Sequence, residues 1–350
     1  MKVLIVKISA LGDVVHALPV LAYLKSADPA VEIDWLMEKS FAPLLEGHPL
    51  IRRVHALAMK AWRQQGWKQA VVGTLGVIRA LRRERYDLVL DLQGNSKSGL
   101  FTLISGAPLR VGFDRDGVRE WPNLLATNRR IPLTAADHHI GDRALALARG
   151  GLPGGSAAPL AGPLPVDAQA LAKVEVLLAE QGLTRNPLVV LHYGTTWTTK
   201  LWPLASWEHL VALLAEKGLR PILTWGNAEE ETAARAIFAT SEGRAVIWPR
   251  GSLKELVALL SRVDLVVGAD TGPVHIAAAV DTPTVSIYRV TDALRNGPRG
   301  ARHIRLQVDL PCSPCLKKTC ERDNECGARI TVEQVLDAMA TLCPALSSDP

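Results

Sequence analysis

The sequence contains no uncharged apolar run that reaches the roughly 18 residues needed to span a bilayer. Its first segment, MKVLIVKIS, is interrupted by Lys7 before it could serve as the apolar part of a signal peptide. No segment has the biased composition of a disordered or collagenous tract, and aromatic residues other than Trp are few. We therefore expect a folded protein that resides in the cytoplasm.

Two further features that the sequence lacks reduce the range of possible functions. No G-x-G-x-x-G motif follows the first predicted strand, which argues against a nicotinamide-dependent dehydrogenase. The excess of basic residues is small, 40 against 35 acidic ones, and it is spread along the chain. Such a mixed surface is compatible with an acidic partner but does not indicate nucleic acid, and a basic binding module would show itself by salt-dependent affinity for nucleic acid.

Cysteine is scarce and unevenly placed. Four of the five cysteines fall in one short segment, at Cys312, Cys315, Cys320 and Cys326. This clustering differs from the disulfide framework of a small secreted domain. The spacing would allow a compact tetrahedral site for structural zinc or iron, whereas free thiols or a disulfide are the structural alternatives.

The length and the apolar pattern predict two α/β domains. A chain of 350 residues exceeds the usual single core. Short apolar runs rich in branched residues alternate with helical patterns, which is typical of parallel sheets covered on both faces. Strands are predicted within residues 2–8, 31–37, 52–57, 86–94, 187–194, 220–226, 244–249, 264–270 and 282–288, and helices within 11–27, 70–85, 206–218 and 252–263.

A stretch without periodicity separates the two halves. Residues 149–165, RGGLPGGSAAPLAGPLP, are dominated by Gly, Pro, Ala and Ser and are interpreted as the linker. We place the domains at 1–160 and 161–350. In two doubly wound domains, ligands are expected beyond the carboxyl ends of the strands, in the cleft between the domains.

Three strand ends in the second half carry groups suited to a nucleoside diphosphate. Thr195, Thr196 and Lys200 follow the first of these strands, and Glu229–Glu231 open a helix after the next. Asp270, Thr271 and Gly272 end a third strand, and His275 lies in the first turn of the helix that follows. Helix N-termini, hydroxyls and an ammonium bind phosphate, and a carboxylate can accept from ribose hydroxyls. Each group also has a purely structural interpretation, such as helix capping.

In the first half, Asp13 stands where the first strand turns into the first helix. An aspartate in the first turn of a helix is favoured electrostatically whatever the function. The same position, at a strand's carboxyl end, would let the carboxylate remove a proton from an acceptor hydroxyl. The residues alone leave the two interpretations balanced.

Five segments together resemble the heptosyltransferases of lipopolysaccharide core synthesis. They are KISALGDVVHALPVL, DLQGNSKSGL, TTWTTKLWP, WGNAEEE and ADTGPVHIAAA, in the family's order over nearly the whole chain. DLQGNSKS and EKSFAPLLEGHPLIRRVHAL are most similar to heptosyltransferase I. The resemblance implies a GT-B architecture, in which two Rossmann-like domains, an N-terminal acceptor domain and a C-terminal donor domain, face each other across a cleft.

The resemblance also implies the chemistry. A heptosyltransferase I would move L-glycero-D-manno-heptose from ADP-heptose to the Kdo residue of Kdo-lipid A, with inversion and with no cofactor or metal required. It would work at the cytoplasmic face of the inner membrane as a peripheral protein. The alternatives are a heptosyltransferase II-type enzyme, which acts on a heptose acceptor, and a nucleotide-sugar epimerase of the same fold.

Carried onto this sequence, the resemblance assigns the general base to Asp13, with the flexible Gly12 before it on the acceptor side. The expected donor contacts are Thr195, Thr196, Lys200, Glu230, Asp270, Thr271, Gly272 and His275. The candidates for holding the anionic acceptor are Lys60, Arg63, Lys97 and Arg119, each of which could equally be a solvated surface residue. The sequence departs from the family in two places, at the cysteine cluster and at YRVTDA, where the family often has Gly-Pro-Thr-Asp-Pro after its last strand.

Overall fold

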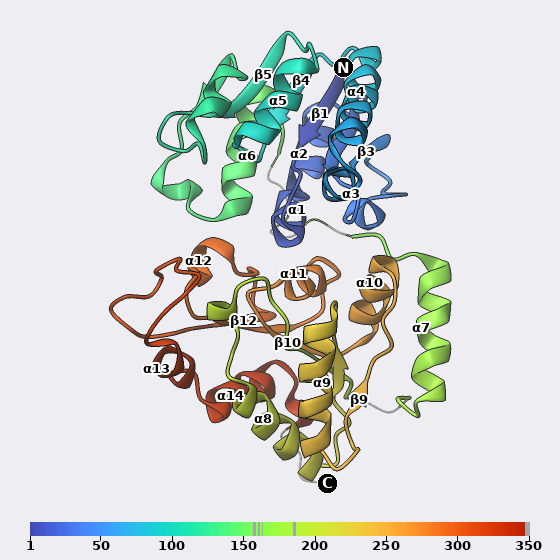
Figure 1. Cartoon of the computed structure of the whole chain (residues 1–350), viewed down its shortest axis with the longest axis vertical. Coiled ribbons are helices and arrows are strands. Elements are labelled where there is room, and N and C mark those ends of the chain that lie inside the picture. The colour runs from blue at the N-terminus through green and yellow to red at the C-terminus, as the bar shows by residue number, and fades with distance from the viewer. Residues whose placement is uncertain (157–158, 160–161, 163, 185–186, 347–350) are drawn as a thin grey trace. The chain divides into compact units, whose positions relative to one another are not determined.

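The chain divides into two compact units, residues 1–165 and 166–350. The computed structural model describes residues 1–156, 159, 162, 164–184 and 187–346, except for the side chains of Lys60 and Arg63. Figure 1 shows unit 1 in blue to green and unit 2 in yellow-green to red, each a sheet flanked by helices. Within the described residues, every helix is too short or too polar to span a bilayer.

Unit 1 contains a six-stranded parallel sheet in the order β3-β2-β1-β4-β5-β6. This is the doubly wound order, in which strands are added toward one edge of the sheet from β1 to β3 and toward the other edge from β4 onward. The reversal point lies between β1 and β4. The elements are β1 (Lys2–Val6), α1 (Leu11–Ala17), α2 (Pro19–Ala27), β2 (Glu32–Glu38), η1 (Ala42–Leu44), β3 (Arg53–Leu57), α3 (Met59–Gln65), α4 (Trp67–Glu84), β4 (Leu88–Asp91), α5 (Ser96–Ile104), β5 (Leu109–Phe113), η2 (Trp121–Leu125), β6 (Arg129–Ile131), η3 (Ala135–Asp137) and α6 (Ile140–Gly151).

Unit 2 repeats the same order with β12-β11-β10-β7-β8-β9, so its reversal lies between β7 and β10. The elements are α7 (Ala168–Glu180), β7 (Val189–His192), η4 (Thr198–Lys200), α8 (Leu204–Glu216), β8 (Ile222–Thr224), α9 (Ala228–Thr240), β9 (Val246–Ile247), α10 (Leu253–Arg262), β10 (Leu265–Ala269), α11 (Gly272–Ala279), β11 (Thr284–Tyr288), α12 (Ala293–Asn296), β12 (His303–Gln307), α13 (Asp323–Ala328), α14 (Val332–Leu342) and η5 (Pro344–Leu346).

The predicted fold class is confirmed, because all nine predicted strands are present in two parallel sheets. Central strands such as β1 and β10 are buried along almost their whole length, which is why they are continuous apolar runs. The strands that sequence reasoning missed are β5, β6 and β12. Two of these, β6 and β12, are edge strands, and their exposed or half-buried positions admit Arg, His and Gln.

The predicted linker is wrong at its start. Helix α6 continues to Gly151, so residues 149–151 are helical. Two glycines are accommodated there because each packs closely against the sheet: a Cβ on Gly150 would lie 2.3 Å from Ile131, and one on Gly151 would lie 2.8 Å from Leu90. Residues 157, 158, 160, 161 and 163 of the predicted linker lie outside the described residues.

A glycine in β10 determines how closely α11 approaches the second sheet. A Cβ on Gly268 would lie 2.7 Å from Val274 in α11 and 3.3 Å from the carbonyl oxygen of His192 in β7. Any larger residue would push α11 away from the sheet. The start of α11 is therefore held at the carboxyl edge of the strands.

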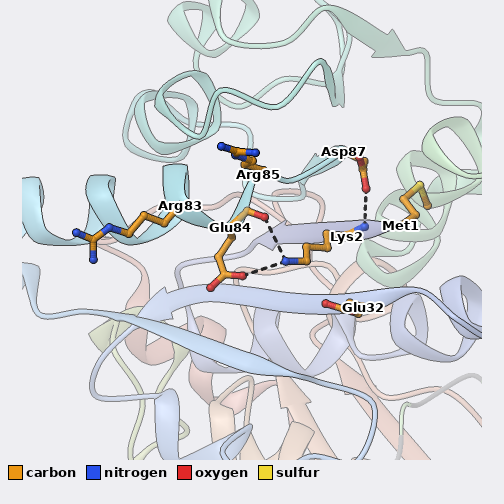
Figure 2. Close-up of a pocket in the computed structure, with 7 residues that line it drawn as sticks. All are labelled: Met1, Lys2, Glu32, Arg83, Glu84, Arg85 and Asp87. Carbon is orange, nitrogen blue, oxygen red and sulfur yellow. Dashed lines mark hydrogen bonds and ion pairs between the residues drawn. The ribbon is translucent and has the colours of Figure 1, made fainter.

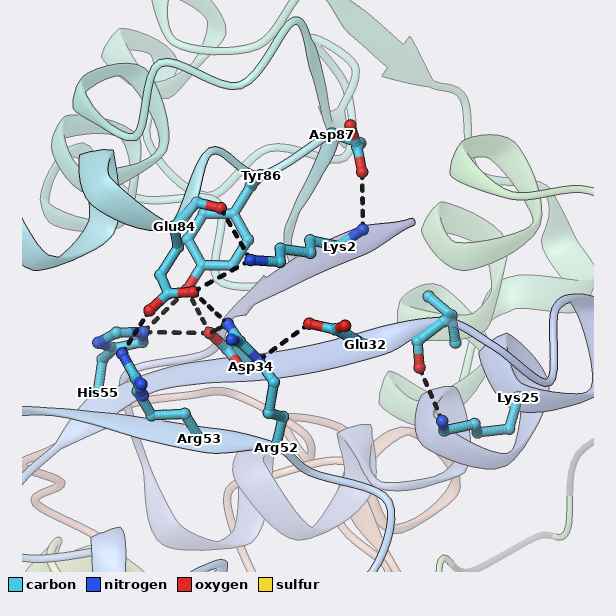
Figure 3. A network of polar contacts seen from close by, with 11 residues as sticks. Lys2, Lys25, Glu32, Asp34, Arg52, Arg53, His55, Glu84, Tyr86 and Asp87 are labelled. Carbon is cyan, nitrogen blue, oxygen red and sulfur yellow. Dashed lines mark hydrogen bonds and ion pairs between the residues drawn. The ribbon is translucent and has the colours of Figure 1, made fainter.

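A buried polar network pins β2 to β3 and to the start of β4 in unit 1 (Figure 3). The Asp34 carboxylate is fully buried and accepts two hydrogen bonds from Arg52, at 3.0 and 2.6 Å, and one from the Tyr86 hydroxyl at 2.6 Å. The His55 ring nitrogen lies 3.4 Å from it. Burial alone would raise the pKa of Asp34, but the hydrogen bonds from His55, Arg52 and Tyr86 outweigh it and lower the pKa to about 2.

This network predicts acid-sensitive stability. Because the pKa of Asp34 is lower in the folded than in the unfolded chain, its stabilisation is present above about pH 4 and is lost as the pH falls toward 2. Asp34→Asn should cost about 2 kcal/mol of unfolding free energy at pH 7. The difference between wild type and variant, measured by urea denaturation, should shrink between pH 4 and pH 2.

The exposed Asp116 provides the control, since Asp116→Asn removes a carboxylate without touching the network. A wild-type-to-Asp34→Asn difference that stays constant from pH 7 to pH 2 would show that the ionised carboxylate does not stabilise the fold.

Candidate functional site

Asp13 lies in the first turn of α1, directly beyond the carboxyl end of β1, as predicted. Its carboxylate oxygen Oδ2 accepts a hydrogen bond from the Ala10 amide at 3.1 Å and lies 3.8 Å from the ammonium nitrogen of Lys7. The side chain remains 28% exposed, so it is both anchored and accessible. The contact with Ala10 shows that Asp13 also caps the helix, and the structural interpretation is therefore fulfilled beside the functional one.

Lys7 is a buried cation that sequence reasoning missed. Its ammonium donates to the Leu92 carbonyl at 3.1 Å, so it connects the end of β4 to Asp13. Beside it, the Gln93 side-chain oxygen accepts from the amides of Ile8 and Ser9, each at 3.1 Å. These contacts bind the β1–α1 and β4–α5 loops together at the reversal point of the sheet, where a doubly wound domain binds ligands.

Two of the predicted acceptor residues come together at the start of α5. The amides of Arg119 and Glu120 donate to the Gly94 carbonyl at 3.1 and 3.0 Å, which fastens their loop to the helix that carries Lys97. The Glu120 carboxylate accepts from the Ser96 amide and hydroxyl, and these bonds lower its pKa, with smaller effects from the charges of Arg119 and Lys97. Both cations are exposed, and both lie close enough to Glu120 for their charges to contribute to its lowered pKa.

The remaining acceptor candidates are Lys60, Arg63 and Gly12. Lys60 and Arg63 fall in α3, directly after β3, but their side chains lie outside the described residues and their role stays a prediction. Gly12 precedes Asp13 in the first turn of α1.

In unit 2, the buried Asp270 gathers groups from three other segments. Asp270 follows β10, and its Oδ2 accepts from the Lys200 ammonium at 2.6 Å and from the Thr291 hydroxyl at 2.8 Å. Its Oδ1 lies 3.2 Å from Nε2 of His275 in α11, and its backbone carbonyl accepts from the Thr195 hydroxyl at 3.2 Å. Burial opposes ionisation, but His275 and Lys200 hold the pKa of Asp270 well below its usual range.

The start of α11 lies beside this cluster. The helix begins at Gly272 with Pro273 next, as predicted, and the Thr271 side chain at the N-cap makes no capping hydrogen bond within the described part of unit 2. The first amides of α11 are thus not occupied by a capping side chain, and such amides suit an anion. His275, which was predicted to donate a hydrogen bond to phosphate, is buried against Asp270.

Glu230 is brought to the loop that follows β7. It lies in the first turn of α9, as predicted, and accepts from the Gly226 amide at 2.7 Å and from the Asn227 side chain at 3.0 Å. A Cβ on Gly194 would lie 2.1 Å from the carboxyl carbon of Glu230, so only glycine allows this approach. Burial, and then the charge of Glu230, raise the pKa of Tyr193.

Two ammonium groups flank one indole ring in the loop before α8. The ammonium of Lys200 lies 5.0 Å from the Trp197 ring centroid, and that of Lys318 lies 5.3 Å from it. Lys318 comes from the cysteine-rich segment, more than a hundred residues further along the chain. Two cations near one ring raise the positive potential around it, which favours an anion nearby. Thr196, also predicted at this site, is exposed in the same loop.

The matching family model, described as glycosyltransferase family 9 (heptosyltransferase), covers residues 74–325. Lipopolysaccharide heptosyltransferase 1 of Pseudomonas aeruginosa is 37% identical over 91% of this chain and 87% of its own length. The chain belongs to glycosyltransferase family 9. Lipopolysaccharide heptosyltransferase 1 of Escherichia coli K12 is 32% identical over 83% of the chain and 89% of its own length.

Solved structures agree with this family assignment. The structure described as E. coli heptosyltransferase WaaC with ADP matches with a TM-score of 0.78 and 27% identity, over 98% of this chain and 100% of that one. The same enzyme with ADP-2-deoxy-2-fluoro heptose matches with a TM-score of 0.75 and 28% identity, over 97% and 99%. A putative UDP-N-acetylglucosamine 2-epimerase from Listeria monocytogenes has a TM-score of 0.53 and 13% identity, over 100% of this chain and 91% of that one, which shows the fold alone.

The cysteine-rich segment of this glycosyltransferase is held by residues 288–293, YRVTDA, which depart from the family pattern. The Val290 carbonyl accepts from the amides of Cys315 and Leu316 at 3.1 and 2.9 Å, and the Arg289 carbonyl accepts from the Ser313 hydroxyl at 2.8 Å. The guanidinium of Arg289 is buried and bonds the Leu201 carbonyl and Asp323. The residues that differ from the family run therefore fasten this segment, and Thr291 reaches Asp270.

The predicted metal site gains no support. The cysteines are free thiols, with Cys312 exposed, Cys315 and Cys320 half-buried and Cys326 buried. Among the residues that the structure describes, no group of three or more His, Cys, Asp or Glu is placed so that it could hold a metal ion. Burial is the main cause of the raised pKa of the Cys326 thiol. The segment contributes Lys318 to the Trp197 loop instead.

An open pocket of about 560 Å³ in unit 1 is lined by none of the predicted site residues (Figure 2). Its lining residues, Met1, Lys2, Glu32, Arg83, Glu84, Arg85 and Asp87, lie at or before the starts of β1, β2 and β4. This is the edge of the sheet opposite to Asp13, whereas doubly wound domains bind ligands at the carboxyl edge.

The contacts above predict how the cysteine-rich segment is held. The buried Thr199 hydroxyl donates to the Lys317 carbonyl at 2.7 Å. Thr199→Val removes this hydrogen bond, worth about 1 kcal/mol, so local opening of residues 311–322 should increase about fivefold. Limited trypsin digestion at Lys317 and Lys318 should accelerate by that factor.

Thr198→Val is the matched control, because the exposed Thr198 hydroxyl reaches the Lys318 carbonyl only at 3.5 Å and should contribute little. Equal cleavage rates in Thr199→Val and wild type would show that other contacts hold the segment.

Proposed function

We propose that this family 9 glycosyltransferase moves L-glycero-D-manno-heptose from ADP-heptose to the Kdo residue of Kdo-lipid A, with inversion at the anomeric carbon. The observation that carries this choice is the 37% identity to lipopolysaccharide heptosyltransferase 1 over 91% of the chain. The E. coli lipopolysaccharide heptosyltransferase II structure shares only 21% identity and supports the fold alone, so the chain is assigned to the heptosyltransferase I type.

Unit 2 binds the donor in this proposal. Likeness to structures described with ADP and with an ADP-heptose analogue supports the donor class. The diphosphate is held by the amides at the start of α11 (Thr271 and Gly272), by the hydroxyls of Thr195 and Thr196, and by the ammonium of Lys200. Glu230 accepts from the ribose hydroxyls. Asp270 and His275 orient Lys200 rather than contact the phosphate, because both side chains are buried against each other.

Lys318 supplies a second cation to the same phosphates. The two ammonium groups beside Trp197 are 5.0 and 5.3 Å from one ring, so the negative charge that grows on ADP as it leaves would be shared between them. Lys200 is held by a buried carboxylate, whereas Lys318 is exposed. The Lys200 ammonium is therefore held in a fixed position, whereas the Lys318 ammonium can change its position.

Unit 1 binds the acceptor and supplies the base. The Asp13 carboxylate takes the proton of the Kdo hydroxyl as that oxygen attacks the anomeric carbon of the heptose. The new carbon–oxygen bond forms as the bond to the ADP oxygen breaks, and the electron pair of that bond remains on the diphosphate. One displacement inverts the centre, and the step requires no cofactor or metal. Lys97 and Arg119, with Lys60 and Arg63 from α3, bind the carboxylate and phosphates of the acceptor.

The acceptor determines where the enzyme works. Kdo-lipid A is anchored in a bilayer, and no helix among the described residues spans one. The enzyme is therefore proposed to act as a peripheral protein on the cytoplasmic face of the inner membrane, where the nucleotide sugar is also dissolved.

The role of Asp13 is tested by Asp13→Asn. Asparagine can still accept from the Ala10 amide, so the helix start and ADP affinity should persist while heptose transfer falls about 100-fold or more. Transfer is measured by acceptor-dependent ADP release together with mass spectrometry of the product. Asp116→Asn, which removes an exposed carboxylate, should transfer normally. Near-normal turnover of Asp13→Asn would reduce Asp13 to a helix cap, and ADP release without acceptor would favour an epimerase.

The donor site is tested with Lys200→Gln and Lys318→Gln. Loss of a charge-assisted contact of about 1 to 3 kcal/mol should weaken ADP binding about 5- to 150-fold for Lys200→Gln, and less for Lys318→Gln because Lys318 is exposed. Isothermal calorimetry measures the affinity, and Lys217→Gln, at an exposed lysine after α8, is the control. Unchanged affinity in both variants would move the diphosphate away from Trp197.

A further inference from the structure

Exposed apolar side chains are concentrated on three helices of unit 1. Among the described residues, eight of the twelve large apolar side chains that are exposed lie on α4, α5 and η2. The most exposed are Trp67, Trp121 and Leu125, at 73%, 70% and 72%. The eight are Trp67, Val71, Val72, Leu75, Leu100, Leu103, Trp121 and Leu125, whereas the other four are scattered over the rest of the chain.

The three helices that carry these side chains are neighbours, and we call their exposed side the α4 face. Helix α4 packs against α5, and α5 packs against η2, whereas α1, α2 and α6 pack together elsewhere in the unit. On α4, Trp67, Val71 and Leu75 are spaced four residues apart and therefore lie along one side of the helix. Figure 1 shows α4 on the outside of unit 1. The apolar side chains on this face are not covered by any described part of the chain.

The α4 face is cationic as well as apolar. Lys68, Arg79, Arg82 and Arg83 are exposed on α4, and residues 67–83 contain no Asp or Glu. The Lys68 ammonium lies 5.9 Å from the Trp67 ring centroid. Figure 2 shows the guanidinium of Arg83 turned away from Glu84 and Lys2. Glu84, at the helix end, is itself ion-paired with Lys2, Arg52 and Arg53.

We propose that the α4 face docks this protein on the surface of an anionic lipid bilayer. Exposed Trp, Leu and Val together with Lys and Arg are the composition of helices that lie in a membrane interface. A second copy of the chain fits less well, because a two-fold interface would place the α4 cations opposite themselves. Charge complementarity therefore favours anionic headgroups.

The purpose of the docking surface rests on the proposed function, because the proposed acceptor is anchored in a bilayer. Helix α4 leads from the carboxyl end of β3 back to the start of β4, so its Trp67 end lies at the sheet edge that carries Asp13 and Lys97. The most apolar half of the helix is at this end. A bilayer that contacts the α4 face would bring a lipid-anchored headgroup to the same edge.

The experiment is flotation of the full chain with vesicles that contain no acceptor. Wild type should float with vesicles of phosphatidylglycerol and phosphatidylethanolamine, but not with phosphatidylcholine alone. Two triple variants, Trp67→Ser/Val71→Ser/Leu75→Ser and Lys68→Gln/Arg79→Gln/Arg83→Gln, should each bind at least tenfold more weakly. Val176→Ser/Leu294→Ser, which removes two exposed apolar side chains of unit 2, should bind within twofold of wild type.

Three outcomes would overturn the proposal. These are no flotation of wild type, equal flotation of the α4 variants, or a concentration-dependent dimer that the apolar triple variant abolishes while vesicle binding stays unchanged. The last outcome would assign the α4 face to a second copy. Denaturation curves matching wild type would show that the surface variants are folded.

Transfer assays with two acceptors distinguish a failure of the docking proposal from a failure of the proposed function. With a deacylated, soluble Kdo acceptor, the α4 variants should transfer heptose as wild type does, whereas with the vesicle-embedded acceptor they should lose at least tenfold. Asp13→Asn should lose both activities and still float. A wild type that floats and does not transfer would retain the docking surface and refute the proposed function.

Discussion

A carboxylate buried at the end of β10 organises the second domain. Removing an ionised carboxylate from water is costly unless cations and hydrogen-bond donors surround it. Asp270 meets this demand with Lys200 from the loop before α8, His275 from α11 and Thr291 from the loop after β11. The same contacts bring three loops to one point at the carboxyl edge of the sheet. The Asp270 carboxylate thus assembles the edge of the sheet at which we propose that the donor binds.

Asp13 in the first domain is held quite differently. It has one amide donor and one ammonium at 3.8 Å, both on the same oxygen, and its side chain stays 28% exposed. Asp270, whose carboxylate has a lowered pKa and three partners, is unsuited to take up a proton. Two aspartates at equivalent edges of two similar sheets therefore have different environments, because one is enclosed and the other is reachable.

The cysteine-rich segment illustrates how a departure from a family pattern can be absorbed. The carbonyls of Arg289 and Val290 accept hydrogen bonds from the Ser313 hydroxyl and from the amides of Cys315 and Leu316, while the Arg289 side chain also joins the loop at Leu201 to α13. Through Thr199 and Lys318 the segment becomes part of the wall around Trp197. Three of the four clustered cysteines lie in the same loop as Lys318, and the fourth, Cys326, lies in α13.

Periodicity in the sequence was enough to determine the two parallel sheets and most of their strands, because buried parallel strands must be continuous apolar runs. The same rule placed Asp13, Glu230, Asp270 and the start of α11 at carboxyl edges, since polar residues directly after such strands have few other places to lie. The polar edge strands β6 and β12 escaped it because exposed positions carry no apolar signal.

Only the tertiary structure decided which groups meet. Lys7 looks like the end of a strand, Thr291 like part of a loop and Lys318 like part of a cysteine motif, yet each reaches a site residue from another segment. The α4 face has the same origin, because which side of an amphipathic helix is covered depends on neighbours distant in sequence. Local pattern reports the burial of a segment, whereas partners across loops are selected by packing and charge, which no single stretch of sequence contains.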